Sequence, residues 1–513
     1  MRIIDREWRE AADLQPSRAG LALALGGAAV LRLWALGSGI PYMTGVDEPE
    51  VMDRAVRIIK TGEFNPHFFD YPSLYIYLQA AVGVVRFLAG AIWGHWSSLA
   101  QFGASDVYLW GRAVTALAGI ATVWVLYLAG LRWGARTAVL AAALLAVMPL
   151  HVRESHYVLT DVPMTLLVTL AFLLSLRAHE RERVGAFALA GAAAGLAAAT
   201  KYNGAIALVM PLIACWMTPA VRPSRLVASL ATLGAFLAAF LIAAPYTLLD
   251  LPGFLNGFAH LATMYRDPAN TVAAPAATYL KHLRNAWHWP ATLLAAAGLA
   301  LGATRAIKGP GRVKWTLAIA FPAVYFWFIS HQAIVYGRYL LPIVPPLALL
   351  AAGAVVSGVS QLRRYQIPRS ARNALIAALV LLAIVPPAYS AITFDAMIAR
   401  TWTTKQAYDF VLARIPAGSR VTIETRELRL PDSYRTDHVR QLRDKPLEAY
   451  AAGGVNYLIA SSQCYGPFLS EPARYPGEYA DYLRLFRGAP ELARFTPSRD
   501  HPGPELRILK VAP

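Results

Sequence analysis

Residues 226–247 read LVASLATLGAFLAAFLIAAPYT, a run without a single charged side chain. A helix needs about 20 predominantly apolar residues to cross the hydrocarbon core of a bilayer. Comparable apolar stretches recur at about 20–40, 73–94, 106–131, 137–150, 158–177, 184–200, 204–218, 290–305, 315–331, 338–358 and 373–394. The sequence therefore predicts a polytopic α-helical membrane protein.

The composition supports this class. Of the 513 residues, 57% are hydrophobic and 15% are charged, whereas soluble proteins carry about 25% charged residues. The net charge of +17 is typical of a membrane protein with basic cytoplasmic loops, so we expect no nucleic-acid partner. Two cysteines are too few for a cysteine metal cluster or a disulfide framework.

The loop charges predict the topology. If the stretch 73–94 stays on one side of the membrane, arginine and lysine concentrate in alternate loops, near 132–136, 177–183, 222–225, 305–314 and 363–372. The positive-inside rule places these loops in the cytoplasm, together with an N-terminal segment 1–19. The prediction is about 11 transmembrane helices, an external C-terminus, and an interfacial or re-entrant helix at 73–94.

Two external parts flank the predicted transmembrane domain, 20–394. The first is the loop 41–105, where apolar residues at 51, 55, 58 and 59 after Pro49 predict an amphipathic interfacial helix. The second is the tail 395–513. Its helix-like KQAYDFVLARI (405–415) and strand-like RVTIET (420–425) and GGVNYLIAS (453–461) predict a small α/β domain.

Ionisable residues gather at the predicted external ends of the spans. The carboxylates are Asp47, Glu48, Asp70 and Asp161, and the cations are Arg112, Lys201, Arg266 and Arg338. Charges at membrane depth are costly and therefore indicate function. Each acid can instead cap a helix start, and Arg112 can snorkel to the interface. Lys201 lies in so short a turn that it calls for an anion.

Aromatic and histidine residues in the same loops predict the rest of a pocket. These residues are Tyr71, Tyr202, Tyr336, Tyr339 and His156. The cations would hold a phosphate-like leaving group, and a carboxylate would act as a base. A divalent metal is left open, with His67, Asp70 and His260 as candidate ligands.

The order of these motifs resembles that of the GT-C fold glycosyltransferases that use a polyprenyl-phosphate sugar. Within that fold, the protein O-mannosyltransferases and the lipid A aminoarabinose transferases are the most similar. The resemblance is carried by Asp47-Glu48, Asp70-Tyr71-Pro72-Ser73-Leu74, Gly111-Arg112, Arg153 through Asp161, Lys201-Tyr202 and Arg338-Tyr339-Leu340-Leu341-Pro342. Tyr71 stands where the aminoarabinose transferases tend to have lysine, which argues against aminoarabinose as the sugar.

The resemblance implies roles for these residues. Asp47 would activate the acceptor hydroxyl, Glu48 would position the acceptor, and Asp161 would be a second acid in the pocket. The lipid phosphate would contact Arg112, Lys201, Arg266, Arg338 and a tyrosine, Tyr336 or Tyr339. The reaction would be inverting transfer to a protein, glycolipid or polysaccharide at the extracytoplasmic face of the inner (plasma) membrane, among membrane lipids and without a required cofactor.

Two other classes of function remain. A transporter or flippase of a lipid-linked anion would use the same cations, but its polar groups should line both halves of the membrane. Here they collect at one face, which favours an enzyme. A membrane-anchored binding protein would not explain Lys201 or the acid pair Asp47-Glu48.

Overall fold

The structure is a computed structural model, and it describes residues 18–42, 45, 47–267, 272–309, 311–362, 368–424 and 428–511. The predicted cytoplasmic segment 1–19 lies outside these residues except for its last two. The chain divides into two compact units. The first is made of Met1–Leu36 and Glu50–Phe394, and the second of Gly37–Pro49 and Asp395–Pro513.

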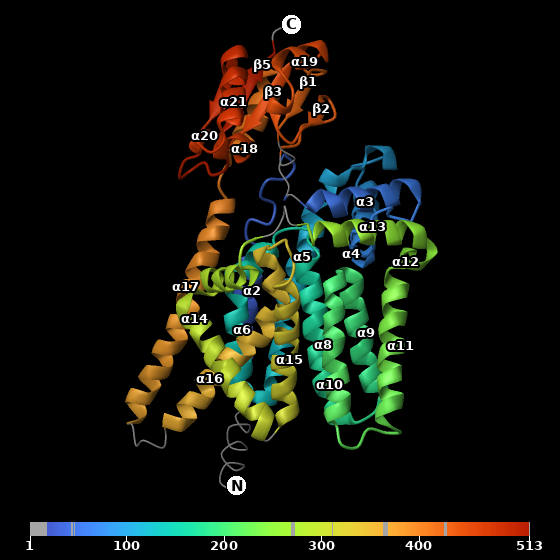
Figure 1. Cartoon of the computed structure of the whole chain (residues 1–513), viewed down its shortest axis with the longest axis vertical. Coiled ribbons are helices and arrows are strands. Elements are labelled where there is room, and N and C mark those ends of the chain that lie inside the picture. The colour runs from blue at the N-terminus through green and yellow to red at the C-terminus, as the bar shows by residue number, and fades with distance from the viewer. Residues whose placement is uncertain are drawn as a thin grey trace. The chain divides into compact units, whose positions relative to one another are not determined.

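The first unit is a helical bundle (Figure 1). Its main helices are α2 (Arg18–Leu33), α5 (Tyr108–Gly130), α6 (Ala135–Ala146), α8 (Asp161–Arg181), α9 (Val184–Thr200), α10 (Val209–Met217), α11 (Arg225–Ala243), α14 (Pro275–Lys308), α15 (Arg312–Ile329), α16 (Val344–Leu362) and α17 (Arg369–Ile398). Among the described residues, seven helices are long and apolar enough to cross a membrane. The polytopic α-helical class is thereby confirmed, while the total of 11 spans stays a prediction.

Small residues allow the closest helix packing in the bundle. Gly191 and Gly195 of α9 face α11, where an added Cβ would lie 2.3 Å from the carbonyl oxygens of Thr232 and Phe236. Such a spacing of small residues lets two backbones approach each other in lipid. The Ala-rich sequence of α9 therefore serves packing against α11 and α8.

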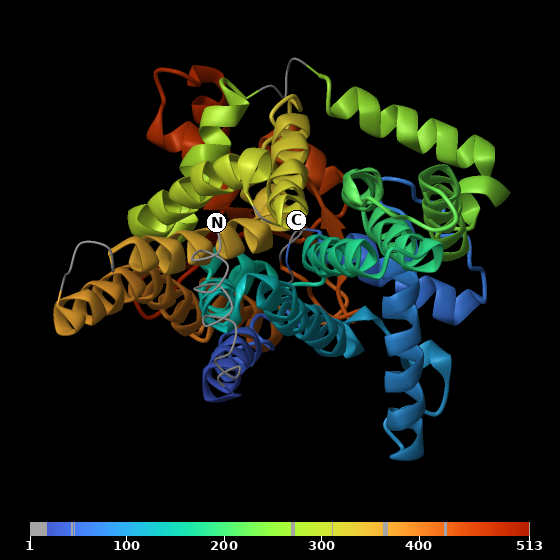
Figure 2. The ribbon, with the colours of Figure 1, turned by 90° about the horizontal axis from the view of Figure 1, so that it is seen from below.

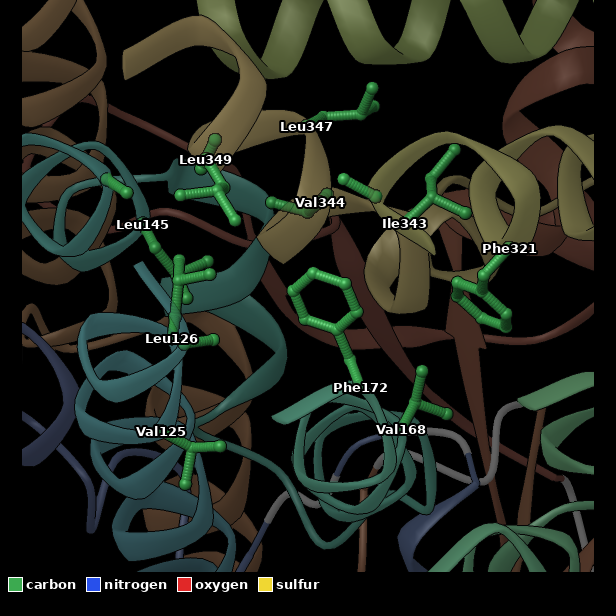
Figure 3. Close-up of a cluster of buried hydrophobic side chains, with 14 of the residues drawn as sticks. Val125, Leu126, Leu145, Val168, Phe172, Phe321, Ile343, Val344, Leu347 and Leu349 are labelled. Carbon is green, nitrogen blue, oxygen red and sulfur yellow. The ribbon is translucent and has the colours of Figure 1, made fainter. Parts of the chain in front are cut away.

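The apolar core of the bundle connects helices that are far apart in the sequence (Figure 3). Leu126 of α5 and Leu145 of α6 face the α16 side chain Leu349, and Phe172 of α8 lies near Val344 of α16. All five side chains are almost fully buried. Dense packing of this kind gives the helix ends fixed positions.

Several helices lie across the bundle at one end. They are α3 (Glu48–Thr61), α4 (Leu74–Ile92), α7 (Pro149–Glu154), α12 (Tyr246–Leu249) and α13 (Leu251–Met264). Figure 2 shows α4 and α13 lengthwise, whereas α8 and α9 are seen nearly end-on. Helix α4 is one of the seven helices that are long and apolar enough to cross a membrane, so the non-crossing position of 73–94 stays a prediction. The predicted amphipathic helix is α3, which buries Val51, Ala55 and Ile58.

Two elements differ from the simple spans that the sequence predicts. Helix α14 begins at Pro275, fifteen residues before the predicted span, and is kinked at His288, where φ is 59° and ψ is 167°. The stretches after Lys201 and Tyr336 begin as the 3-10 helices η4 (Tyr202–Leu208) and η6 (Gly337–Ile343). These differences from simple spans involve α14 and η6, both of which contact α7.

The second unit contains the predicted α/β fold. Its strands are β1 (Arg420–Ile423), β2 (Arg435–His438), β3 (Tyr457–Ser461), β4 (Glu491–Phe495) and β5 (Leu506–Lys510), in the order β2-β1-β3-β5-β4. Strand β1 is parallel to β2 and β3, whereas β5 is antiparallel to β3 and β4. The predicted helix and two strands are α18 (Thr403–Arg414), β1 and β3; β2, β4 and β5 were not predicted.

Helices cover both faces of this sheet. Ile459 of β3 joins the apolar cluster under α18, and its neighbour Leu458 joins the cluster under α19 (Leu447–Ala452), α20 (Ser462–Ser470) and α21 (Pro476–Gly488). Successive residues of a strand point to opposite faces. This explains why β3 is buried at four successive residues and does not alternate between apolar and polar positions.

Candidate functional site

A buried ion cluster lies where α8 begins and α9 ends. Asp161 is the first residue of α8, and Lys201 directly follows α9. Because these neighbouring helices are joined by a short turn, the start of one and the end of the other meet at the same end of the bundle. Lys201 Nζ donates a hydrogen bond to Asp161 Oδ1 at 2.7 Å.

Arg338 completes this cluster from η6. Its Nε lies 3.7 Å from Asp161 Oδ2, so each carboxylate oxygen faces one cation. Asp161 is 2% exposed and Lys201 is 8% exposed. Charges are this deeply buried only when they are paired, because desolvation is otherwise too costly. The cluster brings together three of the predicted site residues, two cations and one carboxylate.

Tyrosines surround the two cations. Lys201 Nζ lies 4.5 Å from the ring centroid of Tyr339 and 5.8 Å from that of Tyr71. Arg338 lies 4.8 Å from the ring centroid of Tyr336. Tyr265, which was not among the predicted site residues, is hydrogen-bonded through its hydroxyl to the Tyr339 hydroxyl at 2.5 Å. The rings hold the cations by cation–π attraction and form an aromatic wall.

The loop between α3 and α4 packs beside the ion cluster. The Tyr202 hydroxyl donates to the carbonyl oxygen of Phe69 at 2.9 Å, and the Phe69 ring contacts Phe254 of α13. The next residue, Asp70, is partly buried. Burial raises the pKa of its carboxyl group, an effect that the nearby charges of His260 and Arg54 oppose.

The candidate metal ligands do not form a set of three in the described part of the chain. No group of at least three His, Cys, Asp or Glu side chains is placed there to hold a metal ion. His67 is hydrogen-bonded to Glu63, while Asp70 and His260 interact through their charges.

Arg112 and His156 both contact the chain that follows α2. Arg112 is 2% exposed, and its Nη1 donates to the Leu36 carbonyl oxygen at 3.1 Å. His156 Nε2 lies 3.0 Å from the Trp34 carbonyl oxygen. These contacts connect the chain that follows α2 to α5 and to the loop between α7 and α8.

Asp47, Glu48 and Arg266 have distinct surroundings. Glu48 is fully buried, and its Oε2 accepts a hydrogen bond from the Gly45 N–H at 2.6 Å. Asp47 is partly exposed and directly precedes α3. Both belong to the second unit. Arg266 is exposed and follows Tyr265 in the first unit.

Arg32 is a buried arginine that was not among the predicted site residues. Arg32 is fully buried at the end of α2, where its Nη1 donates to the Ala146 carbonyl oxygen at 2.9 Å. Its Nη2 lies 3.0 Å from His151 Nδ1. The last carbonyl groups of a helix lack partners within the helix, so Arg32 satisfies the end of α6. A charged residue inside the apolar stretch 20–40 was the signal for such a role.

Comparison with known proteins identifies the fold. The family model of the dolichyl-phosphate-mannose-protein mannosyltransferases matches residues 91–248, whereas a sequence comparison with curated proteins returns no match. The crystal structure of ArnT from Cupriavidus metallidurans bound to undecaprenyl phosphate has a TM-score of 0.55 at 14% identity, over 97% of this chain and 99% of that chain.

An archaeal enzyme is similar to the same extent. The oligosaccharyltransferase of Archaeoglobus fulgidus in the apo form has a TM-score of 0.56 at 14% identity, over 89% of this chain and 71% of that chain. Its complex with an inhibitory peptide and a dolichol-phosphate has a TM-score of 0.54 at 14% identity, over 90% and 71%. This chain therefore has the fold of the GT-C glycosyltransferases.

Proposed function

We propose that this protein is a membrane glycosyltransferase that moves a sugar from a polyprenyl-phosphate donor to an acceptor hydroxyl. The observation that carries the proposal is the buried cluster of Asp161, Lys201 and Arg338. In this cluster two cations meet at one carboxylate at one end of the bundle, in a fold shared with proteins solved with undecaprenyl phosphate and with a dolichol-phosphate.

The cations bind and stabilise the leaving phosphate. Lys201 and Arg338 direct their charges at one carboxylate, and in the proposed reaction both cations also contact the donor phosphate. A phosphate leaves more readily when fixed positive charges neutralise it in a site that excludes water. Asp161 then acts by positioning the two cations, and Tyr336 and Tyr339 shield them. Arg266, the exposed residue that follows Tyr265, supplies a further positive charge in this proposal.

Asp47 is the proposed base. It is partly exposed, and the resemblance to the GT-C glycosyltransferases matches it to the acid that activates the acceptor hydroxyl. Glu48 is fully buried, and its carboxylate accepts a hydrogen bond from Gly45, which suits a role in holding the loop. One base and a bound leaving group give inversion at the anomeric carbon, whereas retention requires a nucleophilic carboxylate. The site faces the extracytoplasmic side of the inner membrane in this proposal.

The test compares the purified wild type with Asp47→Asn. Both are offered radiolabelled polyprenyl-phosphate sugars together with a membrane extract. Removal of a general base lowers the rate by about 10²–10⁴-fold, so we expect this loss of transfer with donor binding retained. Asp53→Asn is the matched control, since Asp53 is an exposed acid of α3. Equal transfer by the wild type and Asp47→Asn would reject Asp47 as the base. Donor binding without transfer by the wild type would favour a flippase.

A further inference from the structure

A cavity lies next to the ion cluster in the first unit. It has a volume of about 320 Å³ and is lined by parts of α7, α14, η6 and α17, including Arg153, His282, Asn285, Gly337 and Phe394. This volume is at the lower end of the range for small-molecule pockets, about 300–1,000 Å³. Its lining does not include Asp161, Lys201 or Arg338, and the proposed reaction does not use it.

The polar lining has little net charge. Arg153 directs both Nε and Nη2 to Glu154 Oε1, at 2.9 Å and 2.6 Å, so that its charge is offset locally. Asn285 Oδ1 accepts a hydrogen bond from Arg284 Nη2 at 2.9 Å, an arrangement that leaves the amide N–H groups of Asn285 as donors. His282 precedes Asn285 by three residues, which places both on one face of α14.

The remaining lining is apolar. Phe394, Ala286 and Leu150 line the same cavity. A sugar ring has hydroxyl groups at its edge that both donate and accept hydrogen bonds, and C–H faces that pack on an aromatic ring. Fixed polar groups beside an aromatic ring therefore match a sugar better than they match a phosphate, which would require uncompensated positive charge.

The chain connects this cavity directly to the ion cluster. Gly337 lines the cavity, and the next residue, Arg338, contacts Asp161. Consecutive Cα atoms are about 3.8 Å apart, so the two sites are neighbours. A ligand that reacts beside Lys201 can therefore place an adjoining unit in the cavity. In the proposed function the transferred group is one sugar, so we assign the adjoining unit to the acceptor.

We propose that the cavity between α7, α14 and η6 binds a sugar unit of the acceptor, and that the acceptor is consequently a glycan. The acceptor role rests on the proposed function. The bound unit is held by His282 and Asn285 through its hydroxyl groups and by Phe394 through its C–H face.

The test measures saccharide binding in the absence of sugar transfer. Full-length protein in nanodiscs is mixed with a panel of neutral di- and trisaccharides, or with a Ser/Thr-rich peptide, and ligand contact is measured by saturation-transfer difference NMR. Ala286→Phe fills the cavity and Asn285→Ala removes its amide. We expect a saccharide signal with the wild type that falls at least fivefold in both variants. The signal should persist in Lys281→Ala, which alters an exposed neighbour on the same helix.

Three results would overturn the proposal. They are no saccharide signal with the wild type, a signal unchanged in both cavity variants, or a peptide signal that these variants abolish. In a transfer assay, both variants should raise the acceptor KM at least tenfold and leave donor hydrolysis unchanged. Saccharide binding by a wild type that transfers no sugar would reject the proposed function and still support a carbohydrate site.

Discussion

Each unit contains a buried carboxylate, and the two differ in their partners: one contacts cations and the other accepts hydrogen bonds from neutral groups. Asp161 lies between the cations Lys201 and Arg338. Glu424, which directly follows β1, is fully buried and accepts hydrogen bonds from neutral donors. These donors are the N–H of Leu442 at 2.9 Å, the N–H of Ser461 at 3.0 Å and the hydroxyl of Tyr482.

The different partners of the two carboxylates indicate different roles: we assign Asp161 to the binding site and Glu424 to the stability of the second unit. In the Asp161 cluster one carboxylate holds two cations in place, and we propose that these cations bind the donor phosphate. Glu424 has its oxygens occupied by groups from the end of β3, from α21 and from the chain before α19, so it holds the sheet and its helices together. Burial raises the pKa of Glu424 to about 7, although the hydrogen bonds from Tyr482, Leu442 and Ser461 oppose the shift.

We expect the largest loss of stability and of transfer rate when the Asp161 cluster loses its closest cation, Lys201. Lys201→Met leaves a buried carboxylate without that partner, and breaking a buried pair in this way costs about 3–5 kcal/mol. Loss of a charge that stabilises the leaving group lowers the rate by about 10²–10³-fold. Thermal unfolding and the transfer assay measure the two effects.

A double variant sharpens this prediction. Asp161→Asn combined with Lys201→Met removes both charges of the pair, so we expect stability to recover in part while transfer stays low. Lys405→Met, which alters an exposed lysine of α18, is the control. Wild-type transfer by Lys201→Met would exclude Lys201 from the phosphate site.

We expect the titration of Glu424 to have a smaller effect, a pH dependence of the stability of the second unit. Its folded pKa of about 7 lies above the ordinary value of 4.5, so the proton favours the folded unit. This stabilisation is complete below about pH 4.5 and is lost as the pH rises through 7, by up to about 3 kcal/mol at about 1.4 kcal/mol for each pKa unit. Hydrogen-exchange protection of β1 and β3, corrected for intrinsic rates, should fall between pH 5 and pH 8.

Glu424→Gln isolates the titration. The amide does not titrate, so protection should be independent of pH over this interval. Its lower absolute stability is expected as well, because one of the N–H donors, from Leu442 or Ser461, would face the amide nitrogen. A variant that keeps the wild-type pH dependence would show that another group titrates.

The smallest effect is expected at an exposed pair. Lys405 and Asp409 are one turn apart on α18 and are 38% and 53% exposed at their side chains. Exposed pairs contribute about 0–1 kcal/mol because water and salt screen them. Asp409→Asn should change the free energy of unfolding of the second unit by about 0.5 kcal/mol or less, measured by the same exchange experiment. A loss above 1 kcal/mol would contradict this ranking of buried and exposed charges.

Much of the architecture was predictable because its signals are local. Uncharged runs such as 226–247 predict membrane helices, and the period of apolar residues in 51–59 predicts α3. Even the convergence of Asp161 and Lys201 follows from local order, since two helices joined by a short turn bring their far ends together. Strand β2 was missed because it is short and polar. Strands β4 and β5 were missed because they are short and mix apolar with charged residues, so neither shows a clear strand pattern.

The sequence by itself determined the class of protein, its apolar helices and the end of the bundle where charges gather, because each depends on residues within one or two turns. Only the tertiary structure decided which side chains meet. Arg32 and His151 are 119 residues apart, Tyr265 and Tyr339 are 74 apart, and Glu424 and Tyr482 are 58 apart. Such contacts depend on the packing of whole helices and strands, which fixes the geometry at which a buried charge or hydroxyl finds its partner.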